Sequence, residues 1–335
     1  MPGTAVEASP ATPFGDRLAA AVAERQSQVV LGIDPDPAAL WPDAVEAMAE
    51  SRARLVMALA DVERSVALEL GGGGRSGRLE AAAAVLAHCM ALIDAAGPAC
   101  VAVKPQLACF ERLGFPGWLA LEATVSYAHG EGLLVIADAK RGDFPGSARA
   151  YEQALFGGLE TPFGPSPGLG ADAVTQNPLL GEDALAPFVD GAAAAGAGVF
   201  VLVRTSNPGA ADVFDAPLVG GGALWERLAG LVAAAGTPGP ESGLAEVGAV
   251  AGATAPQHLG RMRELMPHAP FLLPGIGAQG GSVAELAPAF GPGRAAALVS
   301  ASRSIANAHA SSGAAPAEAA RAEAERLREE AWALG

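Results

Sequence analysis

The sequence predicts an α/β protein, a (β/α)8 barrel (TIM barrel) with parallel strands, from two observations. Eight short β-type runs recur along the chain, and helix-like segments separate them. Most of the runs are continuously apolar, which is typical of strands buried on both faces of a parallel sheet. The runs are Val29–Asp34, Cys100–Lys104, Leu133–Asp138, Ala171–Asn177, Gly198–Arg204, Val247–Ala251, Phe271–Pro274 and Ala296–Ser300. Eight such strands alternating with helices favour a barrel, with a doubly wound open sheet as the alternative; the eighth run also fits a helix.

The 335 residues are predicted to form a single barrel domain, residues 1–335, with two additions to the repeat. Residues 36–98, between the first two strands, are predicted to be a helical insertion, which the run Gly71–Gly74 interrupts. We interpret this run as a flexible turn between helices, because no strand precedes it and no Lys-Ser or Lys-Thr pair follows it. Residues 315–334 are rich in Ala, Glu and Arg and predict an amphipathic C-terminal helix at the surface.

The charge balance restricts the possible partners. Lys and Arg total 21 against 36 Asp and Glu, which gives a net charge of −15. We expect no nucleic-acid partner, because binding a phosphate backbone requires clustered basic residues. A small anion can still bind through a few local positive side chains.

Three features bear on the cellular setting. Cys89, Cys100 and Cys109 form no C-x-x-C pair, which is typical of a reduced, cytoplasmic protein. Met1–Pro13 lacks the basic start and apolar run of a signal peptide. Glycines, prolines and charges interrupt every apolar stretch before it reaches about eighteen residues, so we expect no membrane span.

Polar residues follow the predicted strands, at the C-terminal end of each apolar run. They include Asp34, Lys104, Asp138, Lys140, Thr175, Asn177, Arg204, Thr205, Ser206, Ser302 and Arg303. In a barrel these ends form one face, and the loops on that face build active sites. Strand ends are also polar simply because they leave the core. Two lysines and two aspartates arriving together favour a functional site.

Asp138 and Lys140 are the leading candidates for chemistry. They are two residues apart, so on a strand their side chains point to the same side, and Lys104 on the neighbouring strand can join them. A lysine flanked by carboxylates stays protonated and can act as an acid. Asp143 follows outside the strand, in a direction that the sequence leaves open. The alternative, a surface salt-bridge cluster, is disfavoured because a buried strand leads directly into Asp138.

A glycine-rich loop follows the seventh predicted strand. Gly275-x-Gly277-x-x-Gly280 matches the dinucleotide fingerprint, but that motif belongs in a first βα unit with an acidic residue about twenty residues later. Here it lies near the C-terminus, so we expect no nicotinamide cofactor. The same glycines suit the phosphate site of a barrel, with Arg303 as a bidentate partner for the phosphate. A salt bridge at a helix start is the alternative role of Arg303.

The sequence gives no support for metal or nucleophilic chemistry. The histidines are His88, His129, His258, His268 and His309. They are scattered, and no pair has the spacing of metal ligands with a carboxylate. No G-x-S-x-G elbow is present. We therefore expect no metal and no cofactor.

Together these motifs resemble the orotidine 5′-phosphate decarboxylases, in particular the longer bacterial type often called type 2. The matching motifs cover all the predicted strands and their loops, in order. They are Leu31–Pro35, Val103–Gln106, Phe110–Glu111, Ala137–Asp143, Asp172–Thr175, Asn177–Pro178, Phe200–Gly209, Val247–Thr254, Leu273–Gly275, Gly277–Gly281 and Ser302–Ile305. The first dozen residues, the segment around Gly71 and the C-terminal tail carry little of the resemblance.

The resemblance implies a homodimeric barrel of pyrimidine biosynthesis that converts orotidine 5′-phosphate to UMP and CO2 without metal or cofactor. It makes Lys140 the proton donor to C6 of the pyrimidine. Lys104, Asp138 and Asp143 complete a charged array. Asp143 and Ser147 are implied to act across the interface, in the partner subunit's site.

The resemblance also implies a set of substrate-binding residues. Asp34 holds the ribose, and Ser206 contacts the pyrimidine ring. Gln279 and Arg303 bind the phosphate. Asn177, Pro274 and Ser147 complete the set. Much of the family has Thr at the position of Ser147, and the hydroxyl of a ribose contact is retained here.

Two other functions fit parts of the pattern. A sugar-phosphate decarboxylase or aldolase-like synthase of the same barrel group keeps the Asp-x-Lys-x-x-Asp pattern but uses Mg²⁺, for which Glu111 could serve as an additional carboxylate. A non-catalytic phosphate-binding barrel is disfavoured, because both lysines and both aspartates are present.

Overall fold

The structure is a computed structural model that describes residues 11–59 and 76–335. The predicted turn at Gly71–Gly74 lies outside the described residues. Parallel strands form a closed barrel in the order β1-β10-β9-β8-β7-β6-β3-β2. They are β1 (Val29–Ile33), β2 (Ala102–Pro105), β3 (Leu134–Arg141), β6 (Ala173–Gln176), β7 (Gly198–Arg204), β8 (Val247–Ala251), β9 (Phe271–Pro274) and β10 (Ala297–Ala301). The predicted barrel is confirmed: the last run is a strand, and it closes the sheet by pairing with β1.

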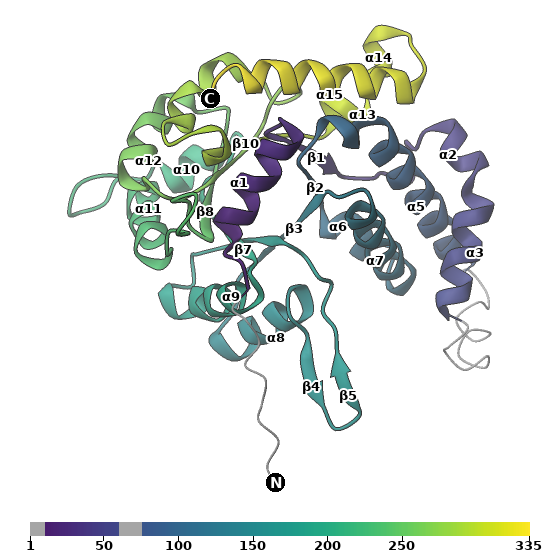
Figure 1. Ribbon diagram of the computed structural model, residues 1–335, viewed down its shortest axis with the longest axis horizontal. Coiled ribbons are helices and arrows are strands. Elements are labelled where there is room, and N and C mark those ends of the chain that lie inside the picture. Colours follow the sequence, from purple (N-terminus) through teal and green to yellow (C-terminus); the bar gives the residue numbers. More distant parts are fainter. Residues whose placement is uncertain (1–10, 60–75) are drawn as a thin grey trace.

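Helices surround the barrel and fill the connections between its strands (Figure 1). The α-helices are α1 (Phe14–Arg25), α2 (Pro42–Glu46), α3 (Met48–Leu59), α5 (Ser76–Ala96), α6 (Leu107–Glu111), α7 (Phe115–Gly130), α8 (Pro145–Leu155), α9 (Glu182–Ala195), α10 (Ala210–Phe214), α11 (Leu224–Ala235), α12 (Leu259–Leu265), α13 (Arg303–Ala306), α14 (His309–Ser312) and α15 (Pro316–Trp332). Short 3-10 helices are η1 (Gly97–Ala99), η2 (Pro256–His258), η3 (Val283–Phe290) and η4 (Arg294–Ala296).

Prolines and glycines set several helix limits. Pro145 and Pro316 occupy the first positions of α8 and α15, where the missing N–H of proline costs no hydrogen bond. Gly196 follows α9 in the left-handed conformation, with φ 64°, and its N–H donates to a carbonyl of the last turn. The C-terminal helix α15 packs along α5 and α13 at one edge of the barrel (Figure 1).

Helix α1 closes the N-terminal end of the barrel, which the strand pattern did not predict. Its Phe14, Leu18 and Val22 are spaced four apart on one face and are buried among inward-facing strand residues such as Phe200. The rings of Phe14 and Phe200 meet edge to face, with 6.0 Å between their centres. Gly198 leaves room for this contact, because a Cβ there would lie 2.4 Å from the Phe14 ring. The end of the barrel that remains accessible is the one where the strands finish.

Helix α5 is long and apolar enough, by length and composition alone, to cross a membrane. It packs against α3, α7 and α15, and 67% of the apolar window within Gly77–Ala99 is buried inside the protein. A helix that is covered on most sides by other helices is expected to be apolar around its whole circumference. We therefore interpret α5 as a largely buried helix within the layer of helices that surrounds the barrel.

A β-hairpin that the sequence pattern did not predict follows α8. Strands β4 (Leu159–Thr161) and β5 (Gly164–Ser166) pair in antiparallel fashion and extend away from the barrel (Figure 1). Each strand has three mostly exposed residues, so neither an apolar run nor an alternating pattern indicates it. The side chain of Phe163 at the tip is 99% exposed.

Candidate active site

A cavity of about 480 Å³ lies at the C-terminal ends of the barrel strands. A volume of this size suits a small-molecule ligand. Residues that the sequence analysis singled out line it: Asp34, Lys104, Asp138, Lys140, Ser206, Pro274, Gln279 and Arg303. Each comes from a strand end or from the loop that follows, on the face where barrels build their active sites.

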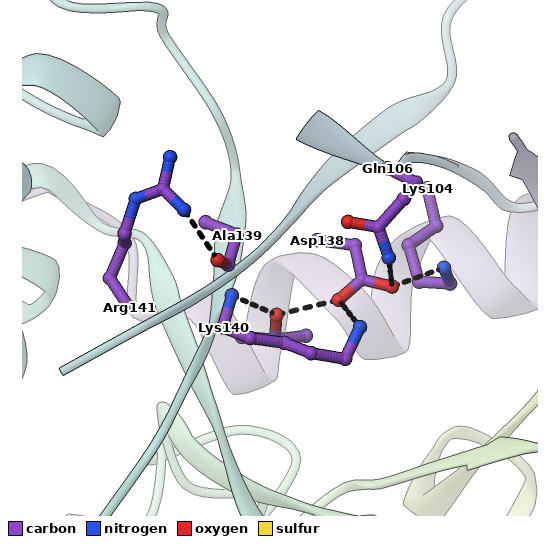
Figure 2. A network of polar contacts seen from close by, with 7 residues as sticks. Lys104, Gln106, Asp138, Ala139, Lys140 and Arg141 are labelled. Carbon is purple, nitrogen blue, oxygen red and sulfur yellow. Dashed lines mark hydrogen bonds and ion pairs between the residues drawn. The ribbon is translucent and has the colours of Figure 1, made fainter. Parts of the chain in front are cut away.

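The Asp138 carboxylate is the centre of a polar network in this cavity (Figure 2). Its Oδ2 accepts hydrogen bonds from Lys104 Nζ at 2.6 Å and from Gln106 Nε2 at 3.2 Å. Its Oδ1 accepts from Lys140 Nζ at 2.5 Å and from Thr175 Oγ1 at 2.7 Å. Two carboxylate oxygens offer about four acceptor sites. The carboxylate is therefore saturated and cannot rotate without losing a contact.

An irregularity in β3 brings these groups together. The register of β3 against β6 shifts between Ala137 and Arg141, and Lys140 within the shift has φ 47°. Such a bulge bends a strand and re-aims its side chains. Asp138 and Lys140 do point to the same side, as their spacing predicts. The final direction of the lysine, however, comes from a left-handed backbone that regular alternation does not predict.

Mutual charge keeps the centre of the network ionised. Burial would raise the pKa of Asp138, but the ammonium groups of Lys104 and Lys140 outweigh it, and the pKa lies well below its usual value. Burial would lower the pKa of Lys104, but Asp138 and Asp34 raise it above its usual value. Lys104 is buried, whereas the Lys140 side chain is 44% exposed. Lys140 is thus the ammonium that a ligand can approach.

The glycine-rich loop after β9 forms another part of the wall. Gly275 has φ 109° and Gly277 has φ 68°, conformations that residues with a Cβ rarely adopt. A Cβ at Gly275 would lie 2.9 Å from the Cβ of Ser206. The loop closes on itself, since the Gly281 N–H donates to the Gly275 carbonyl at 3.0 Å. This tight turn places Gln279 in the cavity wall.

Arg303 follows β10 directly and begins α13. Its side chain lines the cavity. Among residues 11–59 and 76–335, no carboxylate forms an ion pair with it, so the salt bridge considered as its alternative role is not formed there. Its planar guanidinium can therefore offer two parallel N–H donors to an anion in the cavity.

Three residues of the predicted site do not line the cavity of this chain. Asp143 is partly exposed, and its Oδ1 accepts the N–H of Phe144 at 2.8 Å. Ser147 is exposed on α8. Asn177 uses its side-chain oxygen to accept the N–H of Leu179 at 3.0 Å, which stabilises its own loop. Asn177 therefore does not line the cavity of its own chain, and its contact with the substrate stays a prediction.

The cavity also contains polar residues that the predicted site omitted. They are Gln106, Thr175, Thr205, Asn207, Ser300 and Ser302. The signal for Gln106 was its position two residues after Lys104, which is the same spacing that identified Asp138 and Lys140. Thr175 was noted as a polar strand end, but no pattern indicated which group its hydroxyl would bind.

Two charged residues that were considered for the site are engaged elsewhere. Arg204 binds Asp215 through two N–H···O contacts of 2.9 and 3.3 Å. Glu111, the additional carboxylate that an Mg²⁺-dependent enzyme would use, is ion-paired with Arg141. Neither lines the cavity. In the part of the chain that the structure describes, no group of three or more His, Cys, Asp and Glu side chains could hold a metal ion.

The fold and the site define a class, that of (β/α)8 barrels with a polar cavity, lined by lysines and an arginine, at the C-terminal ends of the strands. The sequence model of the family described as Orotidine 5'-phosphate decarboxylase / HUMPS family matches residues 53–322. This match covers most of the chain, and the protein belongs to this family.

Known proteins similar to this chain carry related names. Orotidine 5'-phosphate decarboxylase of Haloarcula marismortui is 39% identical over 292 residues, which cover 87% of this chain and 86% of the relative. Orotidine 5'-phosphate decarboxylase of Rhodopirellula baltica is 42% identical over 229 residues, or 68% and 74% of the two chains. The structure of Leishmania donovani OMP decarboxylase superposes with a TM-score of 0.66 at 29% identity, over 96% of this chain and 99% of that one.

Proposed function

We propose that this protein is an orotidine 5′-phosphate decarboxylase, a lyase that forms UMP and CO2 in pyrimidine biosynthesis. The observation that carries the proposal is the saturated Asp138 carboxylate with Lys104 on one oxygen and Lys140 on the other. This array shares one cavity with Arg303, which suits a phosphate. The names of the relatives and the family support the choice of substrate.

The proposed reaction requires a fixed positive charge beside C6 of the pyrimidine. When the bond from C6 to the carboxylate breaks, its electron pair stays on C6, where the ring delocalises it poorly. The Lys140 ammonium stabilises this charge as it develops and then transfers a proton from Nζ to C6, which gives UMP. Preorganised charge of this kind is usually the largest single contribution to catalysis. Asp138 holds the ammonium in place through the 2.5 Å contact.

One ammonium does not supply the whole rate enhancement. At an effective dielectric constant near 20, a unit charge about 4 Å away contributes roughly 4 kcal/mol. A slow uncatalysed reaction can require about 20 kcal/mol. The remainder must come from binding energy of remote parts of the substrate, used to order the reacting groups. Arg303 and Gln279 at the phosphate, with Asp34 at the ribose, are the proposed sources.

The contribution of Lys140 is tested by the variants Lys140→Ala and Lys140→Arg. We expect both to bind UMP and to lose decarboxylation of orotidine 5′-phosphate. Arginine retains the charge but does not release its proton. A loss of activity in Lys140→Arg would therefore show that the reaction requires proton transfer in addition to charge stabilisation. Turnover by Lys140→Ala close to that of the unchanged protein would contradict the assignment of Lys140 as the acid.

The proposed reaction needs no metal. The engagement of Glu111 by Arg141 supports this, because it withdraws the carboxylate that a Mg²⁺-dependent relative would use. Turnover of orotidine 5′-phosphate is expected to be unchanged in excess EDTA. Activity that disappears with EDTA and returns with Mg²⁺ would contradict the metal-free mechanism.

We further propose a homodimer in which Asp143 and Ser147 reach the partner's cavity. Both lie at or before the start of α8, outside the cavity of their own chain. Apolar side chains are exposed on the adjoining surface: Phe144 (70%), Tyr151 (37%), Leu179 (53%) and Leu180 (47%). Apolar groups gathered on a surface favour a protein interface. A second copy of the chain is the partner that would also give Asp143 a role.

Subunit mixing tests the shared site. Asp143→Ala and Lys140→Ala are each expected to be inactive alone. A mixed dimer contains one site with neither change, so mixing the two proteins should restore up to about a quarter of the full activity per subunit, as the statistics of random pairing dictate. A dimer in which no activity returns, or a monomer in solution, would contradict the shared site.

A further inference from the structure

Thr175 forms hydrogen bonds with both Asp138 and Lys140 and has no role in the mechanism above. It lies in β6 and is 2% exposed. We propose that Thr175 is a positioning residue, whose hydroxyl fixes the backbone of Lys140 and the carboxylate of Asp138 relative to each other. This inference rests on the proposed function, because the position of Lys140 matters to activity only if Lys140 is the acid.

The hydrogen bonds of Thr175 can run in only one direction. The backbone N–H of Lys140 donates to Thr175 Oγ1 at 3.0 Å, and an N–H cannot accept. The ionised Asp138 carboxylate has no proton to donate, so the hydroxyl donates its own proton to Asp138 Oδ1, at 2.7 Å. That oxygen also accepts from Lys140 Nζ at 2.5 Å. The ammonium of Lys140 is thus bound directly to Asp138 Oδ1, and its backbone nitrogen is connected to the same oxygen through the Thr175 hydroxyl (Figure 2).

The bulge in β3 explains why this hydroxyl is needed. The paired positions of β3 and β6 jump from Ala137 opposite Val174 to Arg141 opposite Gln176, so Lys140 stands outside the regular ladder. Its φ of 47° is a conformation that residues other than glycine adopt rarely, because it strains the backbone. A backbone N–H in such a place still needs an acceptor. The Thr175 hydroxyl supplies it from the neighbouring strand.

The loss of this contact should change the rate more than the binding. Without the hydroxyl, Lys140 can relax towards an ordinary backbone conformation and Asp138 can turn, so the ammonium shifts with respect to C6. A displacement of about 1 Å of a reacting group can cost on the order of 100-fold in rate. The phosphate contacts, at Gln279 and Arg303, come from other strands and are untouched.

The experiment compares Thr175→Val, which has nearly the same shape but no hydroxyl, with Thr175→Ser, which retains it. We expect Thr175→Val to lower kcat by about 10- to 100-fold with KM for orotidine 5′-phosphate changed less than about threefold, and Thr175→Ser to restore kcat. Thr124→Val is the matched control, because Thr124 is also buried but does not line the cavity, and its hydroxyl donates to the Ala120 carbonyl in α7 at 2.7 Å. This control should leave kcat unchanged.

Two other outcomes overturn the inference. A kcat of Thr175→Val like that of the unchanged protein would show that the hydroxyl does not position the acid. A loss confined to KM would make Thr175 a substrate-binding residue instead. If Thr175→Val does not fold, Thr175→Ala gives the same comparison, and Thr175→Ser must still be active.

A crystal structure of Thr175→Val separates this inference from the proposed function. We expect Lys140 to leave the left-handed conformation, or its Nζ to move away from Asp138 Oδ1. An unchanged Lys140 overturns the positioning role even if the protein decarboxylates orotidine 5′-phosphate. If Lys140 is displaced in the variant but the unchanged protein does not turn over orotidine 5′-phosphate, the positioning role is retained and the proposed function is rejected.

Discussion

Two buried aspartates, Asp138 and Asp172, lie at opposite ends of the barrel strands and have different roles. They are 5% and 7% exposed, and charged or hydrogen-bonding partners lower the pKa of each although burial would raise it. Asp138 lies towards the C-terminal end of β3, beside the cavity. Asp172 immediately precedes β6, at the N-terminal end, where its carboxylate binds Arg17 of α1 and accepts the Val135 N–H at 2.8 Å.

The partners of the two carboxylates explain the difference. Lysine carries a compact charge on a flexible stem and can release its proton, whereas arginine stays charged and binds a carboxylate through a rigid fork. The lysines at Asp138 therefore suit chemistry. Arg17 at Asp172 also donates to the Gly196 carbonyl at 2.7 Å and so fastens α1 across the barrel end. Equal burial thus corresponds to unequal roles, and the end of the strand decides between them.

The largest effect is expected from Asp138→Asn. The change removes the negative charge that separates two ammonium groups and leaves the buried Lys104 without the carboxylate that pairs with it directly. We expect kcat/KM for orotidine 5′-phosphate to fall by about 1000-fold or more, which is the scale found when preorganised electrostatic groups are removed. Steady-state kinetics of the purified variant measure it. Asp172→Asn is the matched control, and similar losses of kcat/KM in the two variants would contradict the division of roles.

The loss of folding stability at mildly acidic pH is expected to come from neither aspartate. Their lowered pKa values mean that their contributions are present above the unfolded-state value of about 3.9 and are lost only as the pH falls further, through the folded-state values. Burial, with a smaller effect of nearby His309, lowers the pKa of His88 from 6.5 to about 4. Between these two values the unfolded chain binds a proton at His88 that the folded protein excludes. Stability should therefore decrease by up to about 3 kcal/mol as the pH falls from 6.5 towards 4.

Urea unfolding at pH 7 and at pH 4.5 measures this decrease. The His88 ring accepts the backbone N–H of Trp41 through Nδ1 at 3.2 Å. His88→Gln offers an acceptor in place of the ring but does not titrate, so its stability should vary much less between the two pH values. The same decrease in His88→Gln as in the unchanged protein would assign the acid sensitivity to other groups.

Asp172→Asn itself should affect stability and leave catalysis unchanged. The variant loses the charge that Arg17 and His129 contact, and hydrogen bonds to charged groups contribute about 1.5–3 kcal/mol. Arg17 and His129 are partly exposed, so we expect a loss near the lower end, about 2 kcal/mol, in the free energy of unfolding. The kcat measured well below the unfolding temperature should stay within about twofold. A large fall in kcat would mean that the N-terminal end of the barrel contributes to the site.

The sequence predicted the barrel and most of the cavity because both follow local rules. Apolar runs indicate strands, and the polar residues at their ends indicate the functional face, so Lys104, Ser206 and Arg303 were found without any knowledge of contacts. The same rule misplaced Arg204, which lies at a strand end but turns to Asp215. The position of a residue at a strand end thus predicts that it lies on the functional face more reliably than it predicts where its side chain points.

Long-range contacts account for the rest. The pair Arg17–Asp172 joins residues 155 positions apart, and no spacing rule connects them. The role of Thr175 depends on a left-handed lysine that only the folded sheet enforces. The apolar spacing of Phe14, Leu18 and Val22 is visible in the sequence, but a helix before the first strand lies outside the repeat of alternating strands and helices.

The smallest effect is expected from a variant that removes a structural hydrogen bond close to the site. Trp41 Nε1 donates to the Ala306 carbonyl at 2.9 Å, at the end of the short helix that Arg303 begins. Trp41→Phe removes this hydrogen bond, which contributes about 1 kcal/mol. If the helix places Arg303 against the phosphate, KM should rise up to about fivefold, the equivalent of that energy, with kcat unchanged. Trp118→Phe, at a partly exposed ring on α7, is the control. A fall in kcat at constant KM would instead link Trp41 to Lys104, Asp138 and Lys140. Trp41 would then be a residue of the catalytic site rather than one that only supports the fold.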